Sequence, residues 1–224
     1  MMILPGSFFD QDACTLAKQL LGKVIRKRYR SYWLSAQIIE TEAYYMEEKG
    51  SHASLGFTEK RRALFMSPGT IYMYYARGSD SLNISCRGKG NAVLIKSAFP
   101  FEDQLTHSDA IKIMQQLNPL PTGRIRPVAK LCNGQTLLCR SMGLKVTDWD
   151  QQQFDPACFY LEDVKMQPEQ IIQTTRLGIP PGRDETLPYR FIDADFASYC
   201  TSNPQTKRKT VAWSIINQKT HKPD

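Results

Sequence analysis

The sequence has no apolar run long enough to cross a membrane, no Cys-x-x-Cys pair and only three histidines among its 224 residues. A membrane-spanning helix needs about 20 consecutive apolar residues, so no membrane partner is expected. None of the six cysteines has a histidine at zinc-ligand spacing, which argues against a structural metal site. A chain of this size needs no disulfide framework, and we therefore expect reduced, mostly buried thiols.

Internal repeats, low-complexity tracts and clear linkers are also missing, which favours one domain over residues 1–224. The opening Met-Met-Ile-Leu-Pro-Gly lacks the basic and apolar regions of a signal peptide. We therefore expect a cytoplasmic protein, or a nuclear one if the source cell has a nucleus.

Acidic residues are fewer than basic ones, 22 against 29, and the net charge is +7. A basic excess favours a polyanionic partner, because cations that neutralise phosphates release counterions. A basic surface kept for solubility is an equally good interpretation of the composition alone. The short run Lys207–Lys209 is more typical of a solvated face than of a binding patch.

Apolar periodicity predicts an α+β fold: a single mixed domain with a curved antiparallel sheet flanked by short helices. Three strands separated by turn signals at 78–81 and 88–91 indicate an antiparallel meander. A first helix is expected between an Asp10 cap and Gly22, a second between Ser108 and Leu117, and two short ones hinged at Asn133–Gly134. Residues 45–62 read as a functional loop. The expected strands cover 23–29, 33–44, 70–76, 82–86, 92–98, 159–164 and 170–177, and the expected short helices cover 128–132 and 136–142.

The most informative segment is Ile38-Ile39-Glu40-Thr41-Glu42-Ala43-Tyr44, a strand that ends in two carboxylates and a tyrosine. A carboxylate on a strand is held more rigidly than one on a loop, so Glu42 is a candidate general base for activating water. From strand alternation we expect Glu40 to lie on the face opposite to Glu42, and Tyr44 to lie on the same face as Glu42. A solvated surface charge is the ordinary alternative for any single glutamate.

Flat side chains surround this candidate in the sequence. Tyr72 and Tyr74 share a strand face, and aromatic faces can stack on nucleobases. Tyrosines at this spacing are more often core residues, and a lone His52 is more often a surface histidine. Cations near the same segments would suit a phosphate backbone: Lys60, Arg61, Arg62, Arg77, Arg87, Lys89 and Lys96.

These residues resemble the alkyladenine (3-methyladenine) DNA glycosylase family. The resemblance covers roughly residues 5–195 and leaves a C-terminal tail of about 205–224. Its most specific motifs are Glu-Thr-Glu-Ala-Tyr at 40–44 and Met-x-Pro-Gly-Thr-x-Tyr-x-Tyr at 66–74. Further matching segments are His52-Ala53-Ser54, Leu82-Asn83-Ile84, Ala92–Ile95, Leu131–Gly134, Arg176–Ile179 and Tyr189-Arg190-Phe191.

The resemblance implies a monofunctional, monomeric enzyme with no metal and no cofactor, acting on double-stranded DNA that contains damaged purines. In a bacterium such an enzyme would work at the nucleoid. By position, Glu42 resembles the base that activates water. Tyr44, His52 and Tyr74 resemble the walls that hold a flipped purine, and Asn83 resembles the residue that crowds the 2-amino group of a normal guanine.

Several positions depart from the family pattern, among them the turn Ser79-Asp80-Ser81, which is shorter and more polar than usual. Arg77 stands where a tyrosine usually fills the gap left by the flipped nucleotide, and it can stack or contact phosphate instead. Lys96 replaces an arginine near the catalytic water, and Leu137 replaces a lysine that grips DNA. Two alternatives to excision of alkylated or deaminated purines stay open: a damaged-DNA binder with weak or no catalysis, and a nucleoside or RNA N-glycoside hydrolase.

Overall fold

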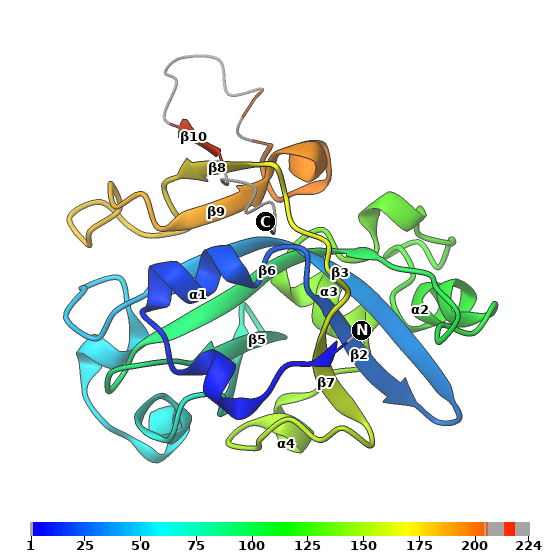
Figure 1. Cartoon of the computed structure of the whole chain (residues 1–224), viewed down its shortest axis with the longest axis horizontal. Coiled ribbons are helices and arrows are strands. Elements are labelled where there is room, and N and C mark those ends of the chain that lie inside the picture. Colours follow the sequence, from blue (N-terminus) through cyan, green and yellow to red (C-terminus); the bar gives the residue numbers. More distant parts are fainter. Residues whose placement is uncertain (1, 204, 206–212, 218–224) are drawn as a thin grey trace, which may run out of the picture.

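The computed structural model describes residues 2–203, 205 and 213–217, and an extended antiparallel sheet organises them. The strands are β1 (Met2–Ile3), β2 (Val24–Tyr29), β3 (Tyr32–Tyr44), β4 (Ile71–Ala76), β5 (Ser79–Ser85), β6 (Ala92–Pro100), β7 (Phe159–Asp163), β8 (Gln170–Thr174), β9 (Arg190–Asp193) and β10 (Trp213–Asn217). The main path runs β1-β7-β2-β3-β6-β5-β4, and β9, β8 and β10 branch from β3 (Figure 1). The predicted α+β class and the β4–β5–β6 meander are confirmed.

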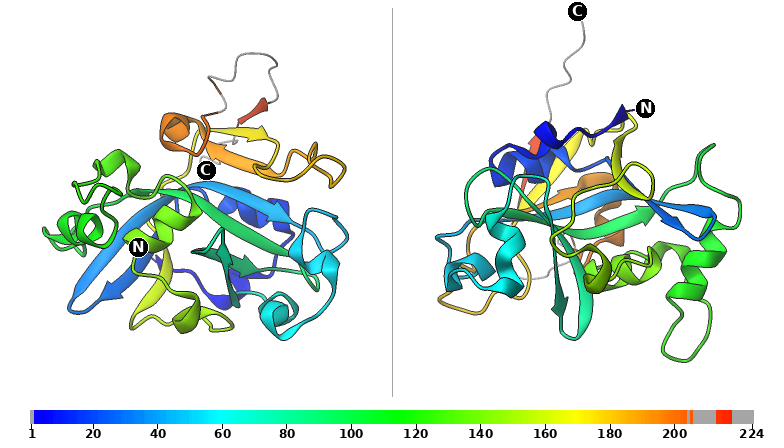
Figure 2. Two further views of the ribbon diagram at one scale, coloured as in Figure 1. Left: turned by 180° about the vertical axis from the view of Figure 1, so that it is seen from behind. Right: turned by 90° about the horizontal axis from the view of Figure 1, so that it is seen from below.

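Short helices cover the sheet. The α-helices are α1 (Ala13–Gln19), α2 (Ala110–Leu117), α3 (Gln135–Ser141) and α4 (Val146–Trp149), and the 3-10 helices are η1 (Gly6–Phe9), η2 (His52–Leu55), η3 (Glu59–Phe65), η4 (Val128–Lys130) and η5 (Ala194–Tyr199). Helix α1 packs on β3 and β6, whereas α3 packs on β5 and β6 from behind (Figures 1 and 2). The cysteines are free thiols, four of them buried, as expected. No helix of the described ranges is long and apolar enough to cross a membrane.

The long strand β3 holds the fold together because it pairs with three neighbours. It pairs with β2 in its first half, with β6 along most of its length and with β9 near its end. The register against β6 shifts on both sides of Glu40, which is the signature of a bulge. A bulge bends a strand, and here it lies two residues before Glu42.

Several predicted boundaries were wrong for local reasons. Asp12 caps α1 by accepting a hydrogen bond from the Thr15 amide at 3.1 Å, whereas Asp10 pairs with Arg87 on the surface. Helix α2 begins at Ala110 behind Asp109, so its N-cap lies one residue after the expected Ser108. The predicted loop at 45–62 contains η2 and part of η3.

The turn expected at 78–81 was also wrong, because β5 already begins at Ser79. The hairpin closes through two residues with positive φ, Arg77 at 52° and Gly78 at 78°. The right-hand view of Figure 2 shows this hairpin projecting from the body. Part of the predicted tail, Trp213–Asn217, is a strand paired with β8, and Lys207–Lys209 lies outside the described residues.

Candidate active site

A cavity of about 970 Å³ opens where β3, β4, β5 and β6 meet the loop of η2 and the start of α3. The sequence-predicted residues that line it are Tyr44, His52, Tyr72, Tyr74, Arg77, Asn83, Lys96 and Leu137. The structure therefore brings together side chains that lie up to 93 positions apart in the chain, Tyr44 to Leu137. This is a size and a lining that suit a flat, partly polar ligand.

Glu42 lies directly behind the cavity wall and has no solvent exposure. Its Oε2 accepts a 2.7 Å hydrogen bond from the Tyr44 hydroxyl, and its Oε1 accepts a 3.2 Å bond from the Leu177 amide. Lys96 Nζ lies 3.4 Å from the same Oε1. Three groups thus hold one carboxylate in a single orientation, and all three residues, Tyr44, Lys96 and Leu177, also line the cavity.

Glu40 belongs to the same side of the sheet as Glu42, so the expectation of opposite faces was wrong. Residues two apart on a strand share a face, and Thr41 between them turns to α1, where its hydroxyl donates to the Ala17 carbonyl at 2.8 Å. Arg190 Nε donates to Glu40 at 2.6 Å, and the Ser97 hydroxyl and Thr201 amide donate to its other oxygen. These contacts give Glu40 a structural role.

Aromatic rings form one wall of the cavity. The rings of Tyr72 and Tyr74 stack with centroids 5.6 Å apart, and the His52 ring meets Tyr74 edge-on at 4.4 Å. His52 Nδ1 lies 3.0 Å from the Tyr72 hydroxyl, which ties the η2 loop to β4. The predicted grouping of His52 with the tyrosines is therefore present.

The protonation of these rings follows from their burial. Burial, and then the charge of Glu42, raises the pKa of Tyr44, so its hydroxyl stays protonated and donates to the carboxylate. Burial also raises the pKa of Tyr74. Although His52 remains partly exposed, desolvation and the nearby Arg61 and Arg183 lower its pKa, which favours a neutral imidazole.

Asn83 is buried in the wall formed by β5, and its amide donates to the Tyr72 carbonyl at 3.1 Å.

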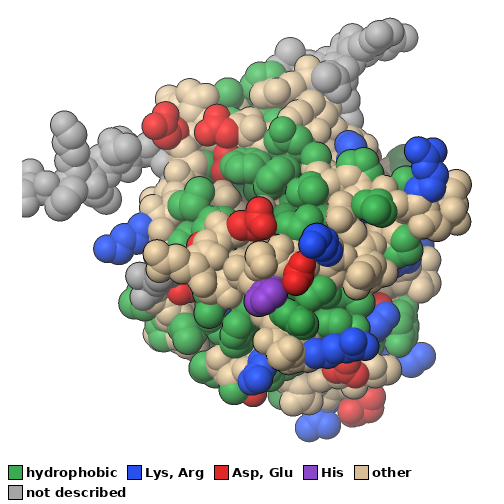
Figure 3. All heavy atoms as spheres, turned by 90° about the vertical axis from the view of Figure 1, so that its right-hand side faces the viewer, with side chains coloured by type: hydrophobic (Ala, Val, Ile, Leu, Met, Phe, Trp, Pro, Cys, Tyr) green, Lys and Arg blue, Asp and Glu red, His purple; other side chains and the backbone are tan. Residues whose placement is uncertain are grey.

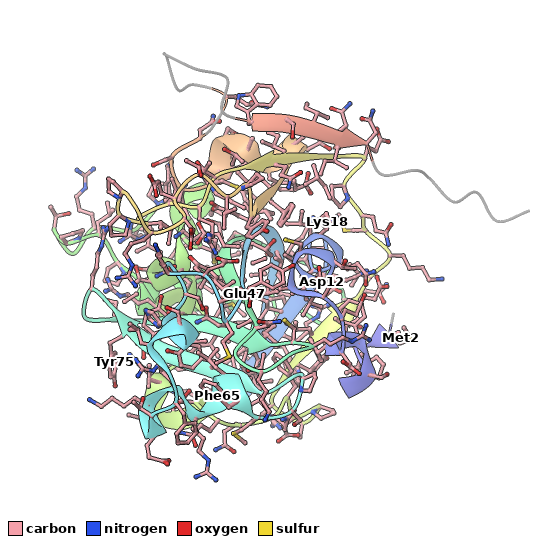
Figure 4. All side chains as sticks on the ribbon, turned by 90° about the vertical axis from the view of Figure 1, so that its left-hand side faces the viewer. Met2, Asp12, Lys18, Glu47, Phe65 and Tyr75 are labelled. Atoms are coloured by element: carbon pink, nitrogen blue, oxygen red, sulfur yellow. The ribbon has the colours of Figure 1, made fainter. Side chains whose placement is uncertain are left out.

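Arg77 is exposed at the hairpin tip on the cavity rim. Its guanidinium approaches residues 175–179, the strap that follows β8, because a Cβ built on Gly178 would lie 3.9 Å from Nη2. Figure 4 shows the neighbouring Tyr75 at the periphery of the molecule, pointing away from the body.

Sequence reasoning missed the strap that follows β8, because it extended this strand to Leu177. The strand ends at Thr174, and the Leu177 amide is then free to face Glu42. A backbone donor leaves no residue-type signal, so no pattern could have found it. Residues from α3 and from the chain after η5 were also missed: Gln135, Thr136, Thr201 and Ser202.

Among the described residues, no group of three or more His, Cys, Asp or Glu side chains could hold a metal ion. The cavity offers one oriented carboxylate beside flat rings, which suits hydrolysis at a bond to a planar group.

Comparison with known proteins agrees with this class of enzyme. The family model of methylpurine-DNA glycosylase (MPG) matches residues 7–197. A protein of Pseudomonas aeruginosa strain LESB58, named "Putative 3-methyladenine DNA glycosylase", is 62% identical over 201 residues, which is 90% of this chain and 84% of that protein. A protein of Clostridium beijerinckii with the same name is 32% identical over 196 residues, which is 85% of this chain and 95% of that protein.

The site and these matches define a DNA glycosylase, a hydrolase that acts on N-glycosyl bonds. The chain belongs to the methylpurine-DNA glycosylase family, whose enzymes are monofunctional, and damaged DNA is its substrate.

Proposed function

We propose that this protein flips 3-methyladenine and other alkylated or deaminated purines out of duplex DNA and hydrolyses their N-glycosidic bond with water activated by Glu42. The observation that carries the proposal is the fully buried Glu42 carboxylate, bonded by Tyr44 and Leu177 immediately behind an aromatic cavity. A flipped purine needs a pocket of this kind, because an enzyme cannot reach the bond inside the base stack.

In the proposed step, a water oxygen attacks C1′ of the deoxyribose and the C1′–N bond breaks. The bonding electrons leave with the purine, which is a good leaving group when alkylation has made it cationic. The water proton passes to Glu42, whose negative charge also stabilises the cationic sugar. Lys96 holds one oxygen of Glu42 by charge, so that the other faces Tyr44.

The remaining residues bind the base and the DNA. Tyr44, His52 and Tyr74 would stack on the flipped purine or bond its edge, and Asn83 would crowd an extra 2-amino group. Arg77, at the tip of the projecting hairpin, would fill the gap in the duplex or contact a phosphate. We infer a monomer of one domain acting in the cytoplasm of a bacterium, at the nucleoid.

The face around α2 supplies no concentrated basic patch. Figure 3 shows that Lys and Arg are mixed there with Asp, Glu and apolar side chains. In the proposal, the arginines near the cavity contact DNA: Arg61, Arg77 and Arg183.

An excision assay tests the proposal by offering 3-methyladenine in duplex DNA, in single strands and as a free nucleoside. We expect base release chiefly from the duplex. Binding of the lesion duplex without base release would show a damaged-DNA binder, and release chiefly from nucleosides would show a nucleoside hydrolase. Either result would overturn the proposal.

A further inference from the structure

Arg176 is a buried cation directly behind the cavity wall. It follows β8, its side chain has no solvent exposure, and its guanidinium lies 4.5 Å from the ring centroid of Tyr44 and 5.6 Å from that of Tyr189. Its Nη1 donates to the Ala43 carbonyl at 2.8 Å and forms an ion pair with the buried Glu48.

The rest of the guanidinium is not used for hydrogen bonding. Nε and Nη2 of Arg176 are buried and have no hydrogen-bond partner within the described part of the chain. Buried arginine donors are normally paired, because leaving them unpaired is costly. The arrangement instead places the cation against aromatic rings, where it is attracted by their π electrons.

Tyr44 consequently has different surroundings on its two sides. It lines the cavity, whereas Arg176 does not. A cation on one face of an aromatic ring draws electron density toward itself, which reduces the attraction of the opposite face for a second cation. Among the described residues no such cation lies over Tyr72 or Tyr74.

We propose that Arg176, held by Glu48, determines the charge preference of the base pocket by lowering the affinity of the Tyr44 face for cationic purines. This inference rests on the proposed function, because it requires Tyr44 to stack on the flipped base. The Tyr44 ring then stacks on neutral deaminated purines nearly as well as on cationic alkylated ones. A preference for positively charged purines would come from the rings of Tyr72 and Tyr74. Arg176 is a positioning residue that acts through Tyr44 and touches no substrate.

The two members of the ion pair act in opposite directions. Glu48 offsets the charge of Arg176. Removing Glu48 alone therefore leaves an uncompensated positive charge behind Tyr44, which lowers the affinity of the Tyr44 face for a cationic base further. Removing both charges leaves Tyr44 with its full attraction for a cationic base. A merely structural pair would instead affect all substrates in the same proportion.

The experiment measures single-turnover excision of 7-methylguanine, a cation, and hypoxanthine, a neutral base, from otherwise identical duplexes. The ratio of the two rates is compared with that of the wild type, which cancels the intrinsic lability of each base. Arg176→Met combined with Glu48→Gln removes both charges without leaving one buried and unpaired. We expect the ratio to rise roughly three- to tenfold in this double variant.

Glu48→Gln alone should lower the ratio, and Arg176→Lys, which keeps the cation, should leave it nearest to the wild-type value. Lys27→Met is the matched control, because Lys27 lies 5.4 Å from the Trp149 ring centroid, away from the cavity lining. An unchanged ratio in both Glu48→Gln and the double variant would overturn the inference, and so would a change of the same sign in both.

Failure of the inference and failure of the proposed function remain distinguishable. If the wild type excises neither of these bases and does not excise 3-methyladenine, the proposed function fails. The wild type could instead excise both bases, and Tyr44→Leu could impair excision. If the ratio of the two rates then stays unchanged when Arg176 is substituted, only the inference fails. In a Tyr44→Leu background the double variant should no longer shift the ratio, and a persistent shift would contradict action through Tyr44.

Discussion

The hydroxyl of Tyr44 donates a 2.7 Å hydrogen bond to Oε2 of Glu42, two residues earlier on the same strand. The period of two puts both side chains on one face, and the hydrogen bond joins a ring of the cavity wall to the carboxylate behind it. One strand therefore supplies both the proposed general base and the group that orients it.

Glu42→Gln should keep the fold and the binding of lesion DNA but lower single-turnover excision by about 10²–10⁴-fold, because an amide cannot accept the proton of water. The single Oε1 of glutamine keeps one of the two hydrogen bonds, from Tyr44 or from Leu177, and its NH2 group cannot accept the other. Excision near the wild-type rate would remove Glu42 from the mechanism. The matched control is Glu40→Gln, whose effect should fall on stability.

Tyr44→Phe and Tyr44→Leu should separate orientation from stacking. Phe keeps the ring and loses only the hydrogen bond, so excision should fall while binding of an abasic or flipped-base analogue is retained. Leu also removes the stacking face and should weaken capture of the flipped base by about 1–3 kcal/mol. Equal behaviour of the two variants in a fluorescent flipping assay would show that the ring does not contact the base.

Arg77→Asn should lower the affinity for lesion duplex and reduce the slope of log K against log salt by about one unit, if one phosphate contact is lost. Asn tolerates the positive φ of 52° at this position and suits an Asn-Gly hairpin turn, so the fold is preserved. The affinity for duplex with an abasic-site analogue is measured across a salt series. An unchanged affinity and an unchanged slope would show that a residue other than Arg77 fills the gap left by the flipped nucleotide.

The Glu40–Arg190 pair should govern stability. Glu40→Ala leaves the fully buried Arg190 without its 2.6 Å carboxylate partner, and breaking such a pair costs about 3–5 kcal/mol of unfolding free energy. Urea unfolding measures the loss. Glu40→Met combined with Arg190→Met should be much less destabilising than Glu40→Ala, and equal losses would argue against the buried charge as the cause.

Asp193 should make stability depend on pH. Burial raises the pKa of Asp193 to about 6 in the folded protein, above its ordinary value of 3.8. The folded state then holds the proton more tightly than the unfolded state, so this residue reduces stability as the pH rises from about 4 to 6.

Asp193→Asn should therefore match the wild type near pH 4 and exceed it by about 1–3 kcal/mol at pH 7.5. The Asn side chain can still accept the hydrogen bond from the Asp195 amide, 3.1 Å in the wild type, so the start of η5 is preserved. Urea unfolding of both proteins at the two pH values gives the difference. A constant difference across this range would assign the effect to packing.

The sequence alone predicted the class of fold and the meander, because both depend on local periodicity. It also named Glu42, Tyr44, His52, Tyr74 and Asn83 through short family motifs, and the structure places the last four in the cavity lining, while their roles stay predictions. Element ends were less predictable, because side-chain contacts decide them. The cap of α1 moved from Asp10 to Asp12 because Asp10 pairs with Arg87, 77 residues away.

Only the tertiary structure decided what surrounds Glu42. The Leu177 amide and the Arg176 guanidinium reach this strand from more than 130 residues away, because β8 and β9 branch from β3 and bring the strap behind Tyr44. A backbone donor and a buried cation leave no periodic pattern in a sequence. Their positions follow from strand pairing across the whole chain, which local propensities do not encode.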